Sequence, residues 1–265
     1  MRRMADTRAR SLSFGAVADD YDRYRPSYPP ELVADVCALL PGRRVVEIGA
    51  GTGIATSQFA AYGLDITCVE PDPQMAALLA AKFAGIDDVR VTIATLESWS
   101  EARSPADAPF DGLYCAQAWH WTKPETRWRD AAAALSSGGV LALIWNRDGY
   151  SDPDVWRILG EAYDRHGIID RAVPTGGAHE PADWPPDEVE MSQGFTDREL
   201  RTYHWTRRQS VADHVARLNT VSAHLILPAD VRAALTRDLM EMLTEHAGDD
   251  IELAMRTDMA LARRE

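Results

Sequence analysis

The stretch Val45-Val46-Glu47-Ile48-Gly49-Ala50-Gly51-Thr52-Gly53 decides the fold that we expect of this chain. An apolar run gives way to three glycines at alternate positions, and residues 54–60 then follow a helical pattern. A strand, a glycine-rich turn and a helix hold a nucleotide-like ligand at the carboxyl edge of a parallel sheet. Glycine suits such a turn because it adopts positive φ at low cost and lets backbone N–H groups approach a ligand.

The spacing of these glycines separates two classes of ligand. A dinucleotide fingerprint, G-x-G-x-x-G, requires its third glycine at position 54, where this chain has Ile54. The glycines instead follow G-x-G-x-G, with Glu47 two residues before the first. A tight strand–helix turn without a ligand is the alternative explanation, because a glycine string alone is weak evidence.

Composition limits the partners of the chain. Its 265 residues, 46% of them hydrophobic, suffice for one large α/β domain or two small ones. The net charge of −13 would repel a phosphate backbone, so nucleic acid is disfavoured. No apolar run approaches the roughly 20 residues that cross a bilayer, so we expect no membrane partner. Residues 1–6 are basic but precede no apolar segment, so we expect a frayed tail rather than a secretory signal.

Cysteine and histidine spacing gives no sign of a metal site. The three cysteines, Cys37, Cys68 and Cys115, include no C-x-x-C pair, and the histidines show no H-E-x-x-H pattern. An odd number of cysteines in mostly apolar surroundings indicates small buried side chains in a reducing compartment. We therefore expect a cytoplasmic protein without a metal.

The first two-thirds of the chain alternates strand and helix patterns at the pace of βαβ units. Strands are expected at 44–48, 65–70, 89–93, 110–116 and 140–145. Helices are expected at 31–40, at 53–61, after a cap at Asp72 with Pro73 in first position, and at 122–135. Thr122 and Glu125 would form a capping box for the last of these helices, which residues 136–139 would stop.

The pattern changes after Asn146. Helices are expected at 152–165, 211–218 and 229–246, and strands near 200–205 and 259–263. Residues 168–190 are rich in Pro, Gly and acidic residues, which is typical of either a lid or a surface insertion.

Two acidic positions are candidates for ligand contacts. Glu70 ends the second expected strand, where a carboxylate can accept hydrogen bonds from both hydroxyls of a ribose; a charge at a helix terminus is the alternative. After the third strand come Thr95, Leu96 and Glu97, which are candidates for contacts with the same ligand. In the competing interpretation Glu97 is solvated, and Ser98 forms a capping box with Glu101.

The string Trp119-His120-Trp121 follows the fourth expected strand, at the crevice where open α/β sheets bind ligands. Tryptophan offers a flat wall to an apolar or cationic group, and histidine can act as a base near neutral pH. A packed aromatic corner with a hydrogen-bonded histidine is the alternative.

Together these strings resemble the class I S-adenosylmethionine-dependent methyltransferases, in particular the small-molecule subgroup that includes trans-aconitate methyltransferase-like proteins. The resemblance is carried by 47–53, 69–72, 117–121 and 138–143 and by the aromatic-rich segment 14–29. It covers residues 12–147 well and the remainder loosely. The chain departs from the family at Ala94 and Thr95, where an acid is common.

The resemblance implies a doubly wound, mostly parallel seven-stranded Rossmann-like sheet with helices on both faces and an antiparallel last strand. It implies a single domain over 1–265, in which residues 1–30 cap the cofactor and residues 149–250 cover the substrate. The cofactor would be S-adenosylmethionine, with S-adenosylhomocysteine as product. The expected cofactor-binding residues are Tyr21, Arg25, Glu47, Gly49, Ala50, Gly51, Gly53, Glu70, Pro71, Met75, Thr95, Leu96, Glu97 and Gln117.

The acceptor is expected to be a small molecule, methylated on a carboxylate or hydroxyl oxygen, and the protein to be a monomer or homodimer. Trp119, His120, Trp121, Asn146 and Arg147 would bind the acceptor, with His120 as the catalytic base. An NAD(P)-dependent oxidoreductase would share the glycine turn and Glu70 and is one alternative. A non-catalytic S-adenosylmethionine-binding protein and a methyltransferase acting on protein or nucleic acid are the others.

Overall fold

The computed structural model describes residues 14–104, 106–168 and 193–265. These residues form two compact units. Unit one comprises 14–26, 147–168 and 204–256, and unit two comprises 27–104, 106–146, 193–203 and 257–265. The basic residues 1–6 and nearly all of the irregular stretch 168–190 lie outside the described residues. Within the described ranges, no helix combines the length and the apolar character needed to cross a membrane.

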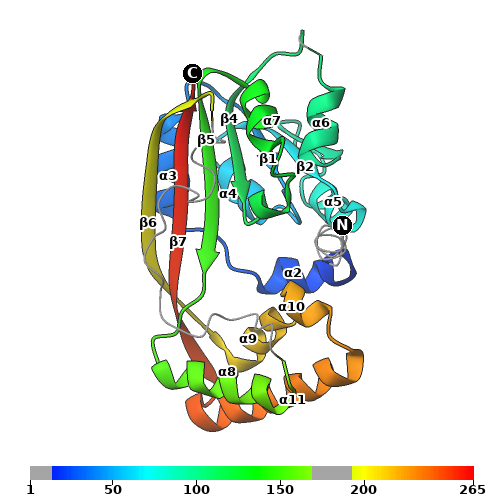
Figure 1. Ribbon diagram of the computed structural model, residues 1–265, viewed down its shortest axis with the longest axis vertical. Coiled ribbons are helices and arrows are strands. Elements are labelled where there is room, and N and C mark those ends of the chain that lie inside the picture. Colours follow the sequence, from blue (N-terminus) through cyan, green and yellow to red (C-terminus); the bar gives the residue numbers. More distant parts are fainter. Residues whose placement is uncertain (1–13, 105, 169–192) are drawn as a thin grey trace. The chain divides into compact units, whose positions relative to one another are not determined.

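A seven-stranded sheet of order β3-β2-β1-β4-β5-β7-β6 organises the fold (Figure 1). Six strands are parallel and the last, β7, is antiparallel to them, which confirms the predicted fold class. The strands are β1 (Arg44–Ile48), β2 (Asp65–Glu70), β3 (Val89–Ile93), β4 (Phe110–Ala116), β5 (Leu135–Arg147), β6 (Phe195–Ser210) and β7 (Asp250–Arg264). The order reverses between β1 and β4, and such a switch point opens a ligand crevice at the carboxyl ends of the strands.

Helices cover both faces of the sheet in unit two. Alternate residues of a strand point to opposite faces, so Val45 and Val46 belong to different apolar clusters. The helices α3 (Pro30–Leu39), α4 (Ile54–Ala60) and α5 (Pro73–Lys82) contribute to the first cluster. The helices α6 (Leu96–Ala102) and α7 (Arg127–Ala134) contribute to the second. Burial of both faces explains the continuous apolar runs of the central strands.

Unit one has an apolar core of its own. The helices α8 (Pro153–Arg165), α9 (Val211–Leu218) and α11 (Ala229–Ala247) pack together, and their buried residues include Leu159, Leu218 and Leu239 (Figure 1). Two short helices, α2 (Ala18–Tyr24) and α10 (Ser222–Leu225), and the 3₁₀ turn η1 (Gly15–Val17) complete it. The sequence did not predict η1, α2 or α10.

Two helix starts differ from the prediction. Helix α7 begins at Arg127 rather than Thr122, because residues 119–121 form a 3₁₀ turn, η2 (Trp119–Trp121), and the Thr122 hydroxyl donates to the carbonyl of Trp119. The predicted capping box of Thr122 and Glu125 is therefore wrong. At α6 the capping box joins Thr95 to Ser98, not Ser98 to Glu101. The cap at Asp72 is confirmed, since its Oδ1 accepts from the N–H groups of Gln74 and Met75.

The ends of three strands also differ from the prediction. Residues 136–139 continue β5 instead of stopping a helix, and Gly138 takes a φ of 75° within that strand. The strands β6 and β7 have 16 and 15 residues, well beyond the short segments expected near 200–205 and 259–263. Cys68 and Cys115 are buried and unpaired, as predicted, while Cys37 is partly exposed.

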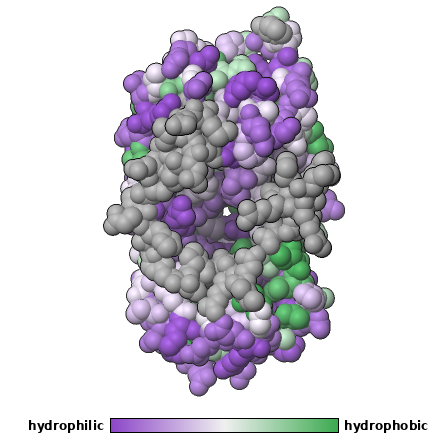
Figure 2. Space-filling view, in the orientation of Figure 1, coloured by the Kyte–Doolittle hydropathy of each residue, from purple (hydrophilic) through white to green (hydrophobic). Residues whose placement is uncertain are grey.

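The described surface is largely polar in the view of Figure 2. Ile226, which directly follows α10, has 49% of its surface exposed. The polar surface agrees with the charged fraction of the chain, 26%, which is ordinary for a globular protein.

Candidate active site

The glycine loop joins β1 to α4 and takes the backbone conformation that its sequence predicts. Gly49, Gly51 and Gly53 have φ values of 69°, 58° and 84°, a region that glycine enters at low cost. Side chains on Gly49 or Gly53 would clash, at 2.2 Å from Ala118 Cβ and 2.5 Å from Leu79 Cδ1. A Cβ on Gly51 would meet nothing closer than Met75 Cε, at 4.0 Å. Gly51 is therefore the glycine whose backbone faces open space.

Glu70 joins this loop to the turn after β2. Its Oε2 accepts from the Gly51 N–H at 2.8 Å, and its Oε1 accepts from the Asp72 N–H at 2.8 Å. Burial raises the pKa of Glu70 to about 7, although the two backbone N–H groups counteract that rise. Each carboxylate oxygen keeps a second lone pair, so Glu70 can still accept hydrogen bonds from ligand hydroxyls.

Glu47, in contrast, lies beneath the loop in the core. Its Oε2 accepts from Thr56 Oγ1 at 2.5 Å and from the Tyr114 hydroxyl at 2.9 Å, and only 1% of the residue is exposed. Burial raises its pKa to about 7 against these two hydrogen bonds. Glu47 therefore supports the glycine loop from within the core. The predicted direct contact of Glu47 with a cofactor stays a prediction.

The residues predicted for the adenine side lie on two neighbouring turns. Met75 is buried on α5 beneath Gly51, and Pro71 is partly exposed. Leu96 is buried at the start of α6 and packs in the second cluster, while Thr95 is exposed and caps that helix.

Glu97 is not simply solvated, because its Oε1 accepts from the backbone N–H of Lys123 at 2.6 Å. This hydrogen bond joins α6 to the loop after β4.

The turn after β4 presents only part of its predicted aromatic wall. Trp119 is buried and packs edge-on against Trp128, with ring centroids 5.0 Å apart. His120 is exposed, and its ring lies 4.6 Å from that of Trp121. Desolvation of the ring, and then the charge of Arg127, lower the pKa of His120 to about 4. His120 is therefore accessible and neutral at pH 7.

The backbone of Gln117 holds this turn in an uncommon conformation. Its φ is 62°, although it is not glycine, and its N–H donates to the Ile144 carbonyl at 2.8 Å. Its side-chain Nε2 donates to the carbonyl of Asn146 at 3.0 Å. Non-glycine residues in this region concentrate at functional sites, because the surrounding structure must offset the strain.

Asn146 and Arg147 end β5 but belong to different units. Asn146 is part of unit two, where its carboxamide bonds to Ser27 and Thr257. Arg147 is exposed and is the first residue of the next segment of unit one. The carboxamide of Asn146 is thus engaged by protein groups.

Tyr21 and Arg25 lie in unit one. The guanidinium of Arg25 donates to Thr220 Oγ1 at 2.9 Å and to the Thr220 carbonyl at 2.8 Å, and it stands 4.9 Å from the centre of the Tyr21 ring. These contacts fasten α2 to the end of α9. Their predicted contacts with a cofactor remain predictions.

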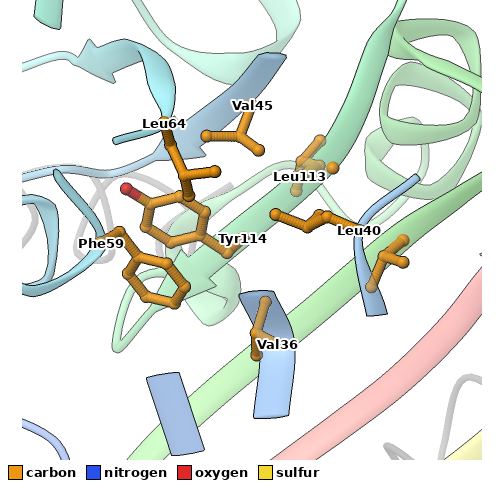
Figure 3. A pocket seen from close by; sticks show the side chains of 9 residues that line it. Val36, Leu40, Val45, Phe59, Leu64, Leu113 and Tyr114 are labelled. Atoms are coloured by element: carbon orange, nitrogen blue, oxygen red, sulfur yellow. The ribbon is translucent and has the colours of Figure 1, made fainter. Parts of the chain in front are cut away.

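A small apolar gap in the core is not a ligand site. It lies between α3, α4 and the sheet, is lined by apolar side chains such as Val36, Leu40 and Phe59, and has no room for a water molecule (Figure 3). Tyr114 stacks on Phe59 there, with ring centroids 4.1 Å apart. The site must instead be built on the glycine loop and the turn after β4.

Three residues of this region escaped the sequence-based prediction. Thr52 is buried inside the loop, and its Oγ1 has no hydrogen-bond partner among the described residues. Ala118 packs against Gly49. Gln58 of α4 accepts a hydrogen bond from the Tyr28 N–H at 2.9 Å and donates one to the Tyr28 carbonyl at 2.8 Å. Thr52 stands within the quoted string and could have been singled out, but nothing local marks Ala118 or Gln58.

Comparison with known proteins agrees with this arrangement. A model of the methyltransferase domain matches residues 46–141. An uncharacterised methyltransferase of Mycobacterium tuberculosis is 34% identical over 241 residues, which cover 89% of this chain and 87% of that relative.

Two solved structures share the fold. A putative type II methyltransferase from Anaeromyxobacter dehalogenans superposes with a TM-score of 0.61 at 22% identity, covering 91% of this chain and 98% of its own. Haemonchus contortus phosphoethanolamine N-methyltransferase 2, solved in complex with S-adenosyl-L-methionine, has a TM-score of 0.52 at 13% identity. It covers 94% of this chain and 57% of its own.

Proposed function

Since the chain belongs to the class I S-adenosylmethionine-dependent methyltransferases, we propose that it methylates a small molecule, on a carboxylate or hydroxyl oxygen. Membership of this family argues against the NAD(P)-dependent oxidoreductase considered above, in agreement with Ile54 in place of a third fingerprint glycine. We propose the small-molecule acceptor, the methylated atom and the roles of individual residues.

The residues of the glycine loop fit S-adenosylmethionine. Gly51 leaves its backbone open, Glu70 has free lone pairs for ribose hydroxyls, and the Thr52 hydroxyl is a buried group without a partner in the described structure. We assign cofactor binding to these three residues, with Gly49 and Gly53 required for packing. The bound cofactor supplies a methyl group on a sulfonium, already activated for displacement. The chain's own contribution is then to align the acceptor and to exclude water.

The single observation that carries the acceptor proposal is His120. It is the exposed side chain of the turn after β4, next to Trp121 and at the carboxyl edge of the sheet. A pKa of about 4 leaves it neutral at pH 7 and makes it a weak base. An acceptor that is ionised before it binds needs no base, so the weak basicity of His120 favours a carboxylate over an aliphatic hydroxyl.

The charge of the chain supports a small acceptor. A net charge of −13 opposes association with a nucleic-acid backbone, whose phosphates attract basic surfaces. We propose that His120 and Trp121 contact the acceptor, while Trp119 supports them from the core.

The test is incubation with methyl-labelled S-adenosylmethionine and a size-fractionated extract of source cells. We expect label in the small-molecule fraction, and loss of that label in mild base if the product is a methyl ester. Base-stable label would shift the proposal from carboxylate to hydroxyl or another atom. Label confined to protein or nucleic acid would refute a small-molecule acceptor.

Two variants test the role of His120. With a carboxylate acceptor no proton is transferred, so we expect His120→Gln to lower kcat only modestly. A fall of about 100-fold or more would show that the imidazole takes part in proton transfer and would favour a hydroxyl acceptor. The matched control is His204→Gln, since His204 is an exposed histidine on β6. Equal turnover of His120→Gln, His120→Ala and the unaltered protein at every pH would remove His120 from the chemistry.

A further inference from the structure

The chain leaves the sheet after β4 at Gln117, where both the backbone and the side chain bind to β5. Ala116 and Ile144 are the last residues paired in the parallel ladder of β4 and β5. The N–H of Gln117 donates to the Ile144 carbonyl at 2.8 Å, and its Nε2 donates to the Asn146 carbonyl at 3.0 Å. All of these residues belong to unit two.

The side chain of Gln117 takes the place of a backbone donor. In a parallel ladder the donors to one strand follow each other two residues apart, so the Asn146 carbonyl would next accept from the N–H of residue 119. That residue, Trp119, instead begins the 3₁₀ turn η2. The carboxamide of Gln117 therefore supplies the donor that β5 would otherwise lose where the chain turns away.

This hydrogen bond explains why glutamine stands at a position with a strained backbone. The φ of Gln117, 62°, lies in the left-handed region, which glycine enters at low cost and glutamine does not. A glycine would relieve the strain, but it has no side chain that could donate to Asn146. Backbone strain that persists beside a ligand crevice motivates a functional hypothesis.

The turn that Gln117 begins brings Ala118 against the glycine loop. A Cβ built on Gly49 would lie 2.2 Å from the Cβ of Ala118, so the two backbones approach closely there. The same loop is bound to the end of β2, because the Gly51 N–H donates to Glu70 Oε2 at 2.8 Å. The glycine loop is thus fixed both by Glu70 and by Ala118.

We infer that Gln117 is a positioning residue, which acts through Ala118 and Gly49 to hold the glycine loop in the conformation that binds the cofactor. This role rests on the assignment of cofactor binding to the glycine loop, not on the identity of the acceptor. A direct contact of Gln117 with the cofactor, as predicted from the sequence, is the alternative. The two differ in whether Ala118 carries the effect of Gln117.

The variant Gln117→Gly tests the role without a large loss of stability. It removes the bond to Asn146 and relieves the strained φ, and these effects oppose each other in the free energy of unfolding. Calorimetry with S-adenosylhomocysteine should nevertheless show the dissociation constant rising about tenfold, because the loop spends less time in its binding conformation. Unaltered affinity in Gln117→Gly would overturn the role.

Ser136→Ala is the matched control, because it removes a side-chain bond between the same two strands at their other end. Ser136 Oγ donates to the Phe110 carbonyl at 3.2 Å. We expect this variant to bind S-adenosylhomocysteine as the unaltered protein does. An equal loss of affinity in Ser136→Ala and Gln117→Gly would mean that any loosening of β4 and β5 weakens binding, which contradicts a specific role of Gln117.

A double-mutant cycle with Ala118→Gly separates positioning from direct contact. Ala118→Gly removes the carbon that packs on Gly49, and alone it should also raise the dissociation constant about tenfold. The double variant of Gln117→Gly and Ala118→Gly should show no further rise, because both changes interrupt the same chain of contacts. A rise of about 100-fold, the product of the single effects, would indicate an independent contact of Gln117 with the cofactor and overturn the positioning role.

Hydrogen exchange followed by mass spectrometry gives a readout without any ligand. In Gln117→Gly we expect exchange to rise about tenfold in peptides covering 46–54 and 117–122, and to stay unchanged in those covering 89–93. Unchanged exchange over 46–54, or an equal rise over all peptides, would contradict the link between Gln117 and the glycine loop. None of these measurements uses an acceptor, so the role of Gln117 can fail while the proposed small-molecule activity holds, and the reverse.

Discussion

Ala118 occupies the space that a side chain on Gly49 would need: a Cβ built on Gly49 lies 2.2 Å from the Cβ of Ala118. The turn after β1 therefore packs directly on the turn after β4. Since Gly49 starts the glycine loop and Ala118 precedes His120, this approach sets the spacing between the proposed cofactor and acceptor sides of the site.

Substitutions at Gly49, Gly51 and Ala118 separate the energetic cost of close packing from the cost of backbone strain. Gly49→Ala should cost more than the roughly 1–2 kcal/mol of a left-handed non-glycine residue, because the clash adds to it. Gly51→Ala should cost about that amount alone, because its Cβ would meet only Met75 Cε, at 4.0 Å. Urea unfolding of both variants, together with Gly49→Ala in an Ala118→Gly background, measures the difference.

The double variant is the control for this argument. Ala118→Gly removes the carbon that clashes with the new side chain. It should therefore recover the stability lost to the clash in Gly49→Ala, but not the stability lost to the positive φ. Equal stabilities of Gly49→Ala with and without Ala118→Gly would mean that the approach to Ala118 does not require glycine at position 49.

Burial of Glu47 predicts a stability that falls as pH rises. Its folded pKa of about 7 lies above its ordinary value of 4.5, so between these values the folded state holds the proton more tightly. Stability linked to Glu47 is complete below pH 4.5 and is lost as pH rises through 7. The full difference is about 3 kcal/mol.

Glu47→Gln tests this linkage, because the amide oxygen can still accept from Thr56 and Tyr114 while the side chain no longer titrates. In urea unfolding at pH 5, 6, 7 and 8, the free energy of unfolding of the variant should increase relative to that of the unaltered protein as pH rises. A constant difference over this range would show that Glu47 does not titrate there.

The sequence predicted most of unit two because its signals are local. The strands β1, β2 and β4 are buried on both faces, so they stand out as apolar runs. These three strands and the edge strand β3 matched the predicted bounds. The glycine loop was recognisable for the same reason, since positive φ at Gly49, Gly51 and Gly53 is a property of single residues.

The remaining features depend on contacts between distant residues. Ser136–Gly139 carry turn signals, yet β5 already begins at Leu135, which pairs with Phe110 across an irregular register. The predicted contact of Asn146 with an acceptor stays a prediction. The hydrogen bonds of its carboxamide to Ser27 and Thr257, which lie 119 and 111 positions away in the sequence, were not predicted. Neither partner leaves a periodic or local signal near Asn146.

The charge of Arg127 should be measurable at His120. Desolvation of the ring and then the charge of Arg127 lower the pKa of His120, so Arg127→Met should raise that pKa above its value of about 4 without restoring the ordinary value. Arg127→Lys keeps the charge and should keep the pKa low. Titration of the His120 ring proton by NMR gives the values.

Arg129→Met is the control for this measurement, since Arg129 lies on the same helix, is 71% exposed and pairs with Asp130. Arg127 also donates to the Trp119 carbonyl at 3.0 Å, so the NMR shifts of Trp119 will report any movement of η2. A His120 pKa unaffected by Arg127→Met, with Trp119 unmoved, would remove the charge of Arg127 as a cause.

Unit one holds a buried ion pair whose disruption should be costly. Arg217 is 2% exposed at its side chain and donates from Nη1 to Asp148 Oδ2 at 2.6 Å. Burial opposes the charge on Arg217, but the carboxylate of Asp148 together with Tyr150 and Tyr163 outweighs that effect, so the pKa of Arg217 is raised. Asp148→Asn would leave the guanidinium buried without its counter-charge, at a cost of about 3–5 kcal/mol in urea unfolding.

The exposed pair of Arg208 and Asp250 provides the comparison, because its side chains are 74% and 47% exposed. Asp250→Asn should cost less than about 1 kcal/mol, since water already screens that pair. Adding Arg217→Met to Asp148→Asn should recover part of the larger loss by removing the unpaired charge itself. If Asp148→Asn and Asp250→Asn lower the free energy of unfolding by the same amount, burial does not make the pair of Arg217 and Asp148 more important for stability than an exposed pair.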